Sequence, residues 1–188
     1  MRSHIFHKCA IISSMKKMWS QISGIPVTIH ESDKVLGKLN GAFIHPETGA
    51  IIAFLVGFSR VLVPVDIEKW SKDSIAISDA DVLVSPFDIL RIEQFGFRRT
   101  YLLGKKVKSK KGYRYGTIKD FTLETTTSSL LSFEVSKGFF WMTWGKRIFS
   151  WADIFEITES AVVLNCEPEQ KSTAFSRHSR IQPICAES

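Results

Sequence analysis

The chain has 188 residues, 44% of them hydrophobic, and a formal net charge of +6. This hydrophobic content excludes wholesale disorder, because enough apolar side chains are present to build a core. No apolar run reaches the roughly 18 to 20 residues that a membrane-spanning helix needs. Three scattered cysteines predict a reducing compartment without a disulfide framework, so we expect a cytoplasmic location.

Residues 1–22 are expected to precede the first folded unit. The stretch up to Met18 is basic, and Lys8 interrupts its short apolar run. We interpret residues 1–22 as a leader that is disordered or not translated, with Met15 and Met18 as alternative start positions. The first regular pattern begins only at Ser23 and Gly24.

Residues 23–84 predict β structure, because short apolar runs rich in Val, Ile and Phe alternate there with turn residues. Strands are expected at residues 26–29, 35–44, 50–58, 59–63 and 74–77. The turn from His45 to Gly49 contains Pro46 and favours a hairpin. Residues 65–70 predict one helical turn that closes the end of a small barrel.

Residues 85–100 predict a short amphipathic helix that links two units. Ser85 is a typical N-cap, Pro86 suits the first helical position, and Ile89, Ile92 and Phe95 follow at three-residue spacing. Residues 101–166 then repeat the β pattern. Residues 167–188 are polar and show no periodicity, so we expect a disordered tail there.

The two β regions are copies of one pattern with a period of about 80 residues. Gly37 stands seventeen residues before Phe54, and Gly116 stands seventeen before Phe133, with similar apolar sequence after each glycine. The period exceeds the roughly 20 to 50 residues of solenoid repeats and suits a small domain. The sequence therefore predicts two tandem compact modules, each with a thin core.

These residues resemble the PRC-barrel family. The likeness rests on Gly24-Ile-Pro-Val, Leu36-Gly37-Lys, the apolar strand at 51–56 and Asp66-Ile67, and it extends in two copies from residue 23 to residue 165. It implies a mainly β fold of two tandem small PRC-type β-barrels joined by a short helix. It also implies barrels like those of the photosynthetic reaction centre H subunit and the ribosome maturation factor RimM, which are docking surfaces and not enzymes.

Positive charge is concentrated at the start of the second copy. Eight basic residues fall within seventeen positions without an acidic residue, whereas the rest of the chain has more acidic than basic residues. This predicted basic surface consists of Arg98, Arg99, Lys105, Lys106, Lys108, Lys110, Lys111 and Arg114, with Phe97, Tyr101, Tyr113 and Tyr115 interleaved. It favours RNA or ribosome contact by charge and stacking, an acidic protein, or an anionic membrane surface. The alternative is a solvated edge strand without a ligand.

Aromatic residues are dense in a stretch of extra residues in the second copy. A small barrel needs large side chains inside, so we expect many of them in the core and the rest exposed as a partner surface. The predicted aromatic patch consists of Phe139, Phe140, Trp141 and Trp144.

The sequence contains no motif that pairs a nucleophile with a base, and no phosphate loop. His4, His7 and Cys9 lack a fourth ligand for a metal. We therefore predict a non-enzymatic interaction or adaptor module without cofactor, metal or small-molecule substrate, which docks a protein or ribonucleoprotein partner. The alternative is an RNA-binding factor in ribosome maturation or RNA processing that uses the basic edge of the second copy.

Overall fold

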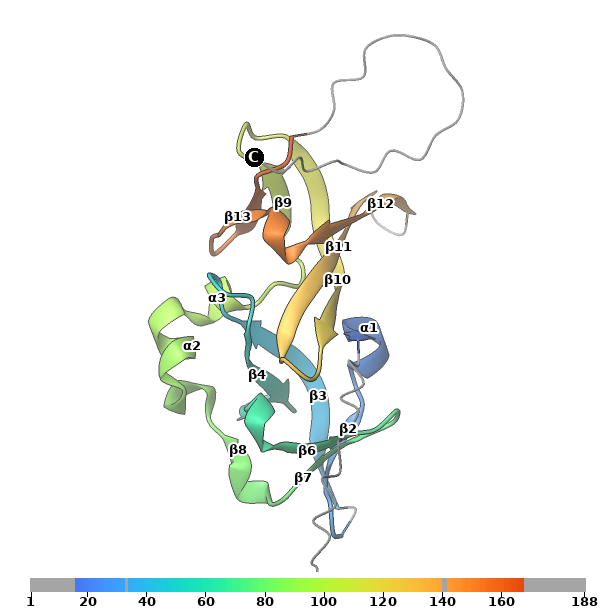
Figure 1. The fold of residues 1–188 in the computed structure, drawn as a ribbon, viewed down its shortest axis with the longest axis vertical. Helices are drawn as coiled ribbons and strands as arrows, with labels where there is room; N and C mark the ends of the chain where they lie inside the picture. The colour runs from blue at the N-terminus through green and yellow to red at the C-terminus, as the bar shows by residue number, and fades with distance from the viewer. Residues whose placement is uncertain (1–15, 33, 140–141, 168–188) are drawn as a thin grey trace, which may run out of the picture.

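The computed structural model describes residues 16–32, 34–139 and 142–167. Within these residues the fold is mainly β, and two sheets follow one another along the long axis of the molecule (Figure 1). The mainly β prediction is confirmed. One sheet curls into a half-barrel, while two tandem barrels joined by a short helix remain a prediction.

The first sheet is formed by the chain between residues 26 and 84. Its strands are β2 (Pro26–Ile29), β3 (Val35–Ile44), β4 (Ile51–Val56), β5 (Arg60–Leu62), β6 (Ile67–Trp70), β7 (Ile75–Ile77) and β8 (Leu83–Val84). Their spatial order is β6-β7-β2-β3-β4-β5-β8. Strands β2 and β7 are parallel, and the other described neighbours are antiparallel.

The second sheet contains the long curved strands of Figure 1. Its strands are β1 (Lys16–Met18), β9 (Lys106–Ser109), β10 (Arg114–Glu124), β11 (Ser129–Phe139), β12 (Met142–Ser150), β13 (Ile154–Ile157) and β14 (Ala161–Leu164). Their order is β12-β11-β10-β9-β14-β13, with β1 added to β10, and β14 is parallel to β9. The order β13-β14-β9-β10-β11-β12 thus corresponds strand by strand to β6-β7-β2-β3-β4-β5 of the first sheet.

Short helical segments connect the strands. They are α1 (Trp19–Ile22), η1 (Pro64–Asp66), η2 (Ala80–Val82), η3 (Pro86–Asp88), α2 (Leu90–Phe95), α3 (Phe97–Thr100) and η4 (Trp151–Asp153). The helical turn predicted at residues 65–70 is shorter than expected, because the chain extends again at Ile67 and pairs with β7. Ser85 is an N-cap as predicted, since the Phe87 N–H donates to Ser85 Oγ at 3.3 Å, but it caps η3 and not α2.

The predicted linker forms a structural layer of its own. Ile92 of α2 is buried together with Phe43, Ile52 and Val61 of the first sheet. Neighbouring residues of β3 and β4 point into the main core, because successive side chains of a strand lie on opposite faces. The first sheet is therefore buried on both faces, with α2 covering one of them.

Residues 16–22, which the sequence places in a leader, belong to the fold as β1 and α1. Trp19 and Ile22 are buried, and Trp19 stacks on Phe121 with 5.3 Å between the ring centroids. The backbone N–H and the hydroxyl of Ser20 donate to the carboxylate of Asp120 at 3.0 and 2.6 Å. These contacts join residues about a hundred positions apart, so local sequence patterns did not reveal them. The rest of the leader, residues 1–15, and residues 168–188 of the predicted tail lie outside the described residues.

The tips of the β3–β4 and β10–β11 hairpins contact each other reciprocally. The Ile51 N–H donates to Ser128 O at 2.7 Å, and the Leu130 N–H donates to Gly49 O at 2.8 Å. In the alignment that pairs Gly37 with Gly116, Ile51 corresponds to Leu130 and Gly49 to Ser128. Each hydrogen bond is therefore the counterpart of the other, as in a contact around a local two-fold axis.

A single main core extends through both sheets. Its largest cluster of buried side chains includes Leu39 and Phe54 from the first sheet together with Phe121 and Phe133 from the second. We expected each copy to have a thin core of its own. The structure instead joins the two halves, because α1 and the hairpin tips bring their apolar faces together.

Candidate functional site

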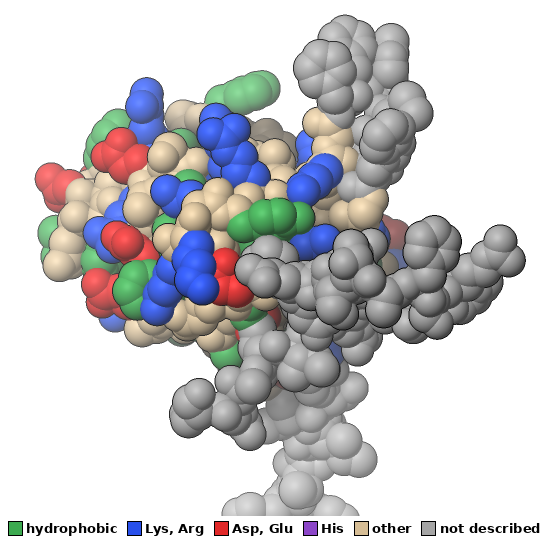
Figure 2. All heavy atoms as spheres, turned by 90° about the horizontal axis from the view of Figure 1, so that it is seen from above, with side chains coloured by type: hydrophobic (Ala, Val, Ile, Leu, Met, Phe, Trp, Pro, Cys, Tyr) green, Lys and Arg blue, Asp and Glu red, His purple; other side chains and the backbone are tan. Residues whose placement is uncertain are grey.

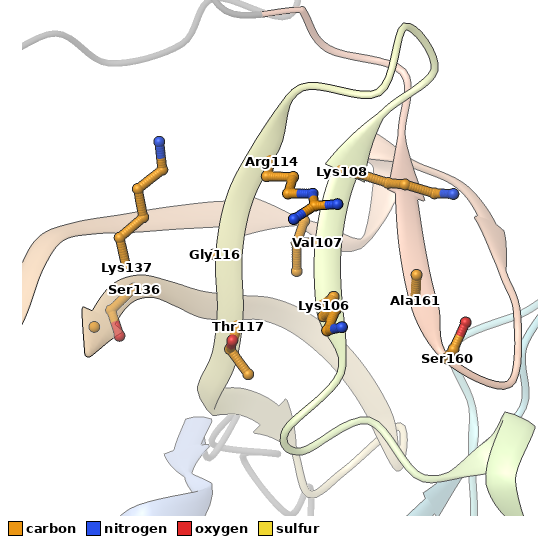
Figure 3. A pocket seen from close by; sticks show the side chains of 11 residues that line it. Lys106, Val107, Lys108, Arg114, Gly116, Thr117, Ser136, Lys137, Ser160 and Ala161 are labelled. Atoms are coloured by element: carbon orange, nitrogen blue, oxygen red, sulfur yellow. The ribbon is translucent and has the colours of Figure 1, made fainter. Parts of the chain in front are cut away.

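A groove of about 500 Å³ crosses four adjacent strands of the second sheet, β14, β9, β10 and β11 (Figure 3). The strand register explains its position. Ala161 lies opposite Lys106, Lys106 opposite Thr117, and Thr117 opposite Ser136, so one residue from each strand forms a continuous row. Residues that are distant in the sequence thus line one surface.

The groove is strongly basic. Its charged lining residues are Lys106, Lys108, Arg114 and Lys137, and no acidic side chain lines it among the described residues. Lys108 and Arg114 lie directly opposite each other on β9 and β10, and like charges in that arrangement destabilise a sheet. Lys and Arg side chains are spread over the end of the molecule that Figure 2 shows, viewed from above the second sheet.

A buried hydroxyl group adds to this lining. Ser136 is 5% exposed, and its Oγ makes no hydrogen bond with any described residue. A buried polar group without a partner costs about 1–3 kcal/mol. Thr117 and Ser160 contribute further hydroxyls to the groove. The site therefore has positive charges and hydrogen-bond donors, the groups that bind carboxylate or phosphate.

Gly116 allows β10 and β11 to approach each other at the groove. Its φ is +141°, and a Cβ at this position would lie within 3 Å of the backbone carbonyl carbon and oxygen of Ser136. The register of β9 against β10 shifts between Arg114 and Gly116. A glycine is therefore required at the irregularity that brings Arg114 and Ser136 to the same groove.

Lys137 was not part of the predicted basic surface. It follows Ser136 on β11, and its Nζ donates to the hydroxyl of Tyr113 at 3.2 Å while lying 4.8 Å from the Tyr113 ring centroid. This hydrogen bond lowers the pKa of Tyr113. Because Lys137 lies more than twenty residues beyond the basic cluster, only the pairing of β10 with β11 brings it to the groove.

The predicted basic surface does not act as one unit. Lys106, Lys108 and Arg114 line the groove. Lys105 is 6% exposed and donates to the carbonyls of Thr158 at 2.5 Å and Glu159 at 3.2 Å. Burial lowers the pKa of Lys105 to about 8, although Glu159 opposes this shift.

Two more basic residues are engaged in packing near the β13–β14 turn. The Arg99 Nε–H donates to Ile157 O at 2.9 Å, and Lys110 Nζ lies 3.6 Å from the ring centroid of Phe155. Arg98 and Lys111 are exposed but do not line the groove. Three residues of the predicted basic surface therefore make contacts within the protein: Arg99, Lys105 and Lys110.

Of the four aromatic residues interleaved with the basic cluster, Tyr115 is buried, Tyr101 is half-buried, and Phe97 is 51% exposed although it packs on other rings. Phe97 packs edge-on against Phe43 at 4.8 Å between centroids, and Tyr101 stacks on Phe97. Tyr115 is buried, and its hydroxyl donates to Cys166 O at 2.8 Å. Tyr113, 37% exposed, remains next to the groove. None of the four rings lines the groove itself, and their stacking on bases stays a prediction.

The predicted aromatic patch cannot be placed on this surface. Phe140 and Trp141 lie outside the described residues, and so do the side chains of Phe139 and Trp144, whose backbones belong to β11 and β12. The patch stays a prediction. Nearby, Phe149 is buried, and Phe155 is 57% exposed beneath Lys110.

The described residues contain no group of three or more His, Cys, Asp or Glu that could hold a metal ion. His4, His7 and Cys9 lie outside them. Cys166 is disulfide-bonded, whereas the sequence predicted no disulfide framework. No helix in the described part of the chain has the length and apolarity to cross a membrane.

Comparison with known proteins assigns one region of the chain to a domain family. No curated protein matches the chain. The family model described as PRC-barrel domain matches residues 96–165, a range that contains every residue lining the groove. The match does not extend to the first copy, so the tandem pair and the likeness to the reaction centre H subunit and RimM stay predictions. Residues 96–165, from α3 to the end of β14, form a PRC-barrel domain.

Proposed function

We propose that this protein is a non-enzymatic interaction module that docks an acidic segment of a partner protein in the groove of its PRC-barrel domain. In this proposal, the half of the protein that contains the first sheet is another copy of the same barrel, and it supports the PRC-barrel domain. A PRC-barrel domain is consistent with a protein-interaction module. The observation that carries the proposal is the groove itself, which collects four basic side chains without a lining carboxylate.

The free groove has unsatisfied interactions that an anionic ligand would relieve. Lys108 and Arg114 are like charges at paired positions of β9 and β10, and the Ser136 hydroxyl is buried without a described partner. A carboxylate beside either cation would form charge-assisted hydrogen bonds, each worth about 1.5–3 kcal/mol. RNA is the alternative ligand, but Tyr113 is the one ring of the interleaved four beside the groove, so sequential base stacking finds little support.

The test is charge reversal with a matched control. In the groove variant, Lys106, Lys108 and Arg114 are changed to Glu; in the control variant, the exposed Lys38, Lys69 and Lys72 of the other half are changed to Glu. Binding of a fluorescent oligoglutamate peptide is measured against salt concentration. We expect the groove variant alone to lose binding, and the wild type to lose affinity as salt rises.

Affinity purification from native cells then identifies the partner. Protein partners that resist nuclease treatment and are lost with the groove variant support the proposal. Equal binding of the peptide by both variants would overturn the role of the groove. Partners that disappear on nuclease treatment, together with retention of the wild type on RNA at low salt, would establish the RNA-binding alternative instead.

A further inference from the structure

The two corresponding 3-10 turns, η1 and η4, share their aspartate but differ at their first two residues, Pro64-Val65 in η1 and Trp151-Ala152 in η4. Each turn follows the fourth strand of its half, and each is closed by a hydrogen bond from the next residue to the first. Trp151 occupies the first position of η4, whereas Pro64 occupies it in η1. The two halves therefore present different side chains at the same place in the fold.

Trp151 reaches the hairpin tip of the opposite half. A Cβ built on Gly49 would lie 2.7 Å from two ring carbons of Trp151, so the indole lies directly against this turn. Gly49 and Ser128 are the corresponding residues of the two tips that exchange hydrogen bonds. The indole thus fills the space between η4 and the tip of the β3–β4 hairpin.

A pocket of about 460 Å³ occupies the corresponding place in the other half. It lies between η1 and the tip of the β10–β11 hairpin, and its lining includes Ile52, Pro64, Val65, Thr126 and Ser128. The small pyrrolidine ring of Pro64 cannot reach Ser128 as the indole of Trp151 reaches Gly49. The side of the local two-fold arrangement with the indole of Trp151 is thus filled, whereas the side with Pro64 contains the pocket.

We propose that this pocket binds an aromatic side chain, most suitably tryptophan, presented by a partner protein, in the position that the Trp151 indole occupies on the corresponding side. This inference is independent of the basic groove. It rests on the correspondence of the two halves and on the fact that the same fold already accommodates an indole at the equivalent position.

The chemistry of the lining fits such a guest. Ile52 is 5% exposed and forms an apolar floor, and Val65 is 84% exposed at the rim, where a partner would cover it. The hydroxyls of Thr126 and Ser128 offer acceptors for an indole N–H, which usually has a partner when buried. Trp70 of β6 and Arg91 of α2 also line the pocket, and a guanidinium such as that of Arg91 can lie over an aromatic face. Tryptophan in a desolvated pocket is a frequent energetic centre of protein interfaces.

The direct experiment uses N-acetyltryptophanamide as a probe on the full chain, with N-acetylleucinamide as the comparison. Methyl NMR is expected to show saturable shifts of Ile52 and Val65 with the tryptophan probe, with a dissociation constant on the order of 1 mM for so small a ligand. The leucine probe is expected to cause no saturable shift. Absence of saturable shifts with both probes would overturn the proposal.

Substitutions locate the site. Pro64→Trp should fill the pocket from within, as Trp151 does, and abolish the shifts, whereas Pro86→Trp at the start of η3 should leave them unchanged. Because a tryptophan in the chain could disturb folding, Val65→Glu at the exposed rim serves as a second variant. Val35→Glu, at a valine 59% exposed on β3, is its control. Unchanged shifts in both Pro64→Trp and Val65→Glu would place the probe elsewhere and refute the site.

Sedimentation of the same variants distinguishes the occupants. If the wild type is a dimer and Val65→Glu a monomer, the pocket is occupied by a second copy of this chain, which contradicts the proposed partner. An unchanged monomer that loses only the tryptophan probe supports a different protein as the source of the aromatic side chain.

Discussion

Gly116→Ala is the substitution for which the structure predicts the largest local conflict. The φ of +141° is one that residues with a Cβ rarely adopt, which costs about 1–3 kcal/mol. The new methyl group would meet the backbone of Ser136 and Lys137, which cannot rotate away as a side chain can. Overpacking of this kind costs a further 1–3 kcal/mol, roughly. We expect the free energy of unfolding to fall by about 4 kcal/mol, the middle of the combined range.

Urea denaturation followed by tryptophan fluorescence measures this loss, and a thermal scan checks it. For a chain of this size, about 4 kcal/mol corresponds to a Tm lower by roughly 8–16 °C. Gly112→Ala is the matched control, because Gly112 has a φ of +88° but no other atom within 4 Å of a built Cβ. The control should lose only about 1–2 kcal/mol from backbone strain. Equal losses in the two variants would refute the close approach of β10 and β11 at the groove.

Two further predictions concern buried polar side chains. Asp120→Ala should destabilise the protein by about 1–3 kcal/mol, because it leaves the Ser20 N–H without its acceptor. Ser20→Ala should destabilise it less. Chemical denaturation of the two single variants and the double variant should give a coupling energy clearly above zero. Lys105 should titrate near pH 8 in a side-chain NMR experiment, below the 10.5 of an ordinary lysine. Between these two pH values the unfolded chain holds more protons, so the stability of the wild type should rise with pH relative to Lys105→Met. If the difference in stability between the wild type and Lys105→Met did not change between pH 8 and pH 10.5, the lowered pKa of Lys105 would be contradicted.

Local patterns in the sequence predicted much of the β structure. The strands at Pro26–Ile29 and Val35–Ile44 have the expected bounds, because alternating apolar residues and the Pro46-containing turn act over a few neighbouring positions. The resemblance to a PRC barrel in the second copy also agrees with the family match to residues 96–165. These features depend on residues close together in the chain, which is why the sequence alone predicted them.

The basic cluster shows what the tertiary structure decided. The sequence determined that positive charge gathers between Arg98 and Arg114, but it could not tell apart the roles of neighbours such as Lys105 and Lys106. Lys105 turns into the protein and bonds the carbonyls of the β13–β14 turn, while Lys106 lines the groove. Alternation along a strand separates the two, and only strand pairing brings Lys137 beside them.

The arrangement of the two halves depends on contacts between residues that lie still farther apart in the sequence. The repeat in the sequence predicted similar strand patterns, and the two sheets do share one strand order. Contacts between distant residues decide the rest. They join the two sheets in one core and pack α1 on β10. They also place Trp151 against the β3–β4 hairpin tip, while the pocket beside Pro64 stays open. Sequence periodicity reports which side of its own element a residue faces; which surface it meets depends on how the whole chain packs.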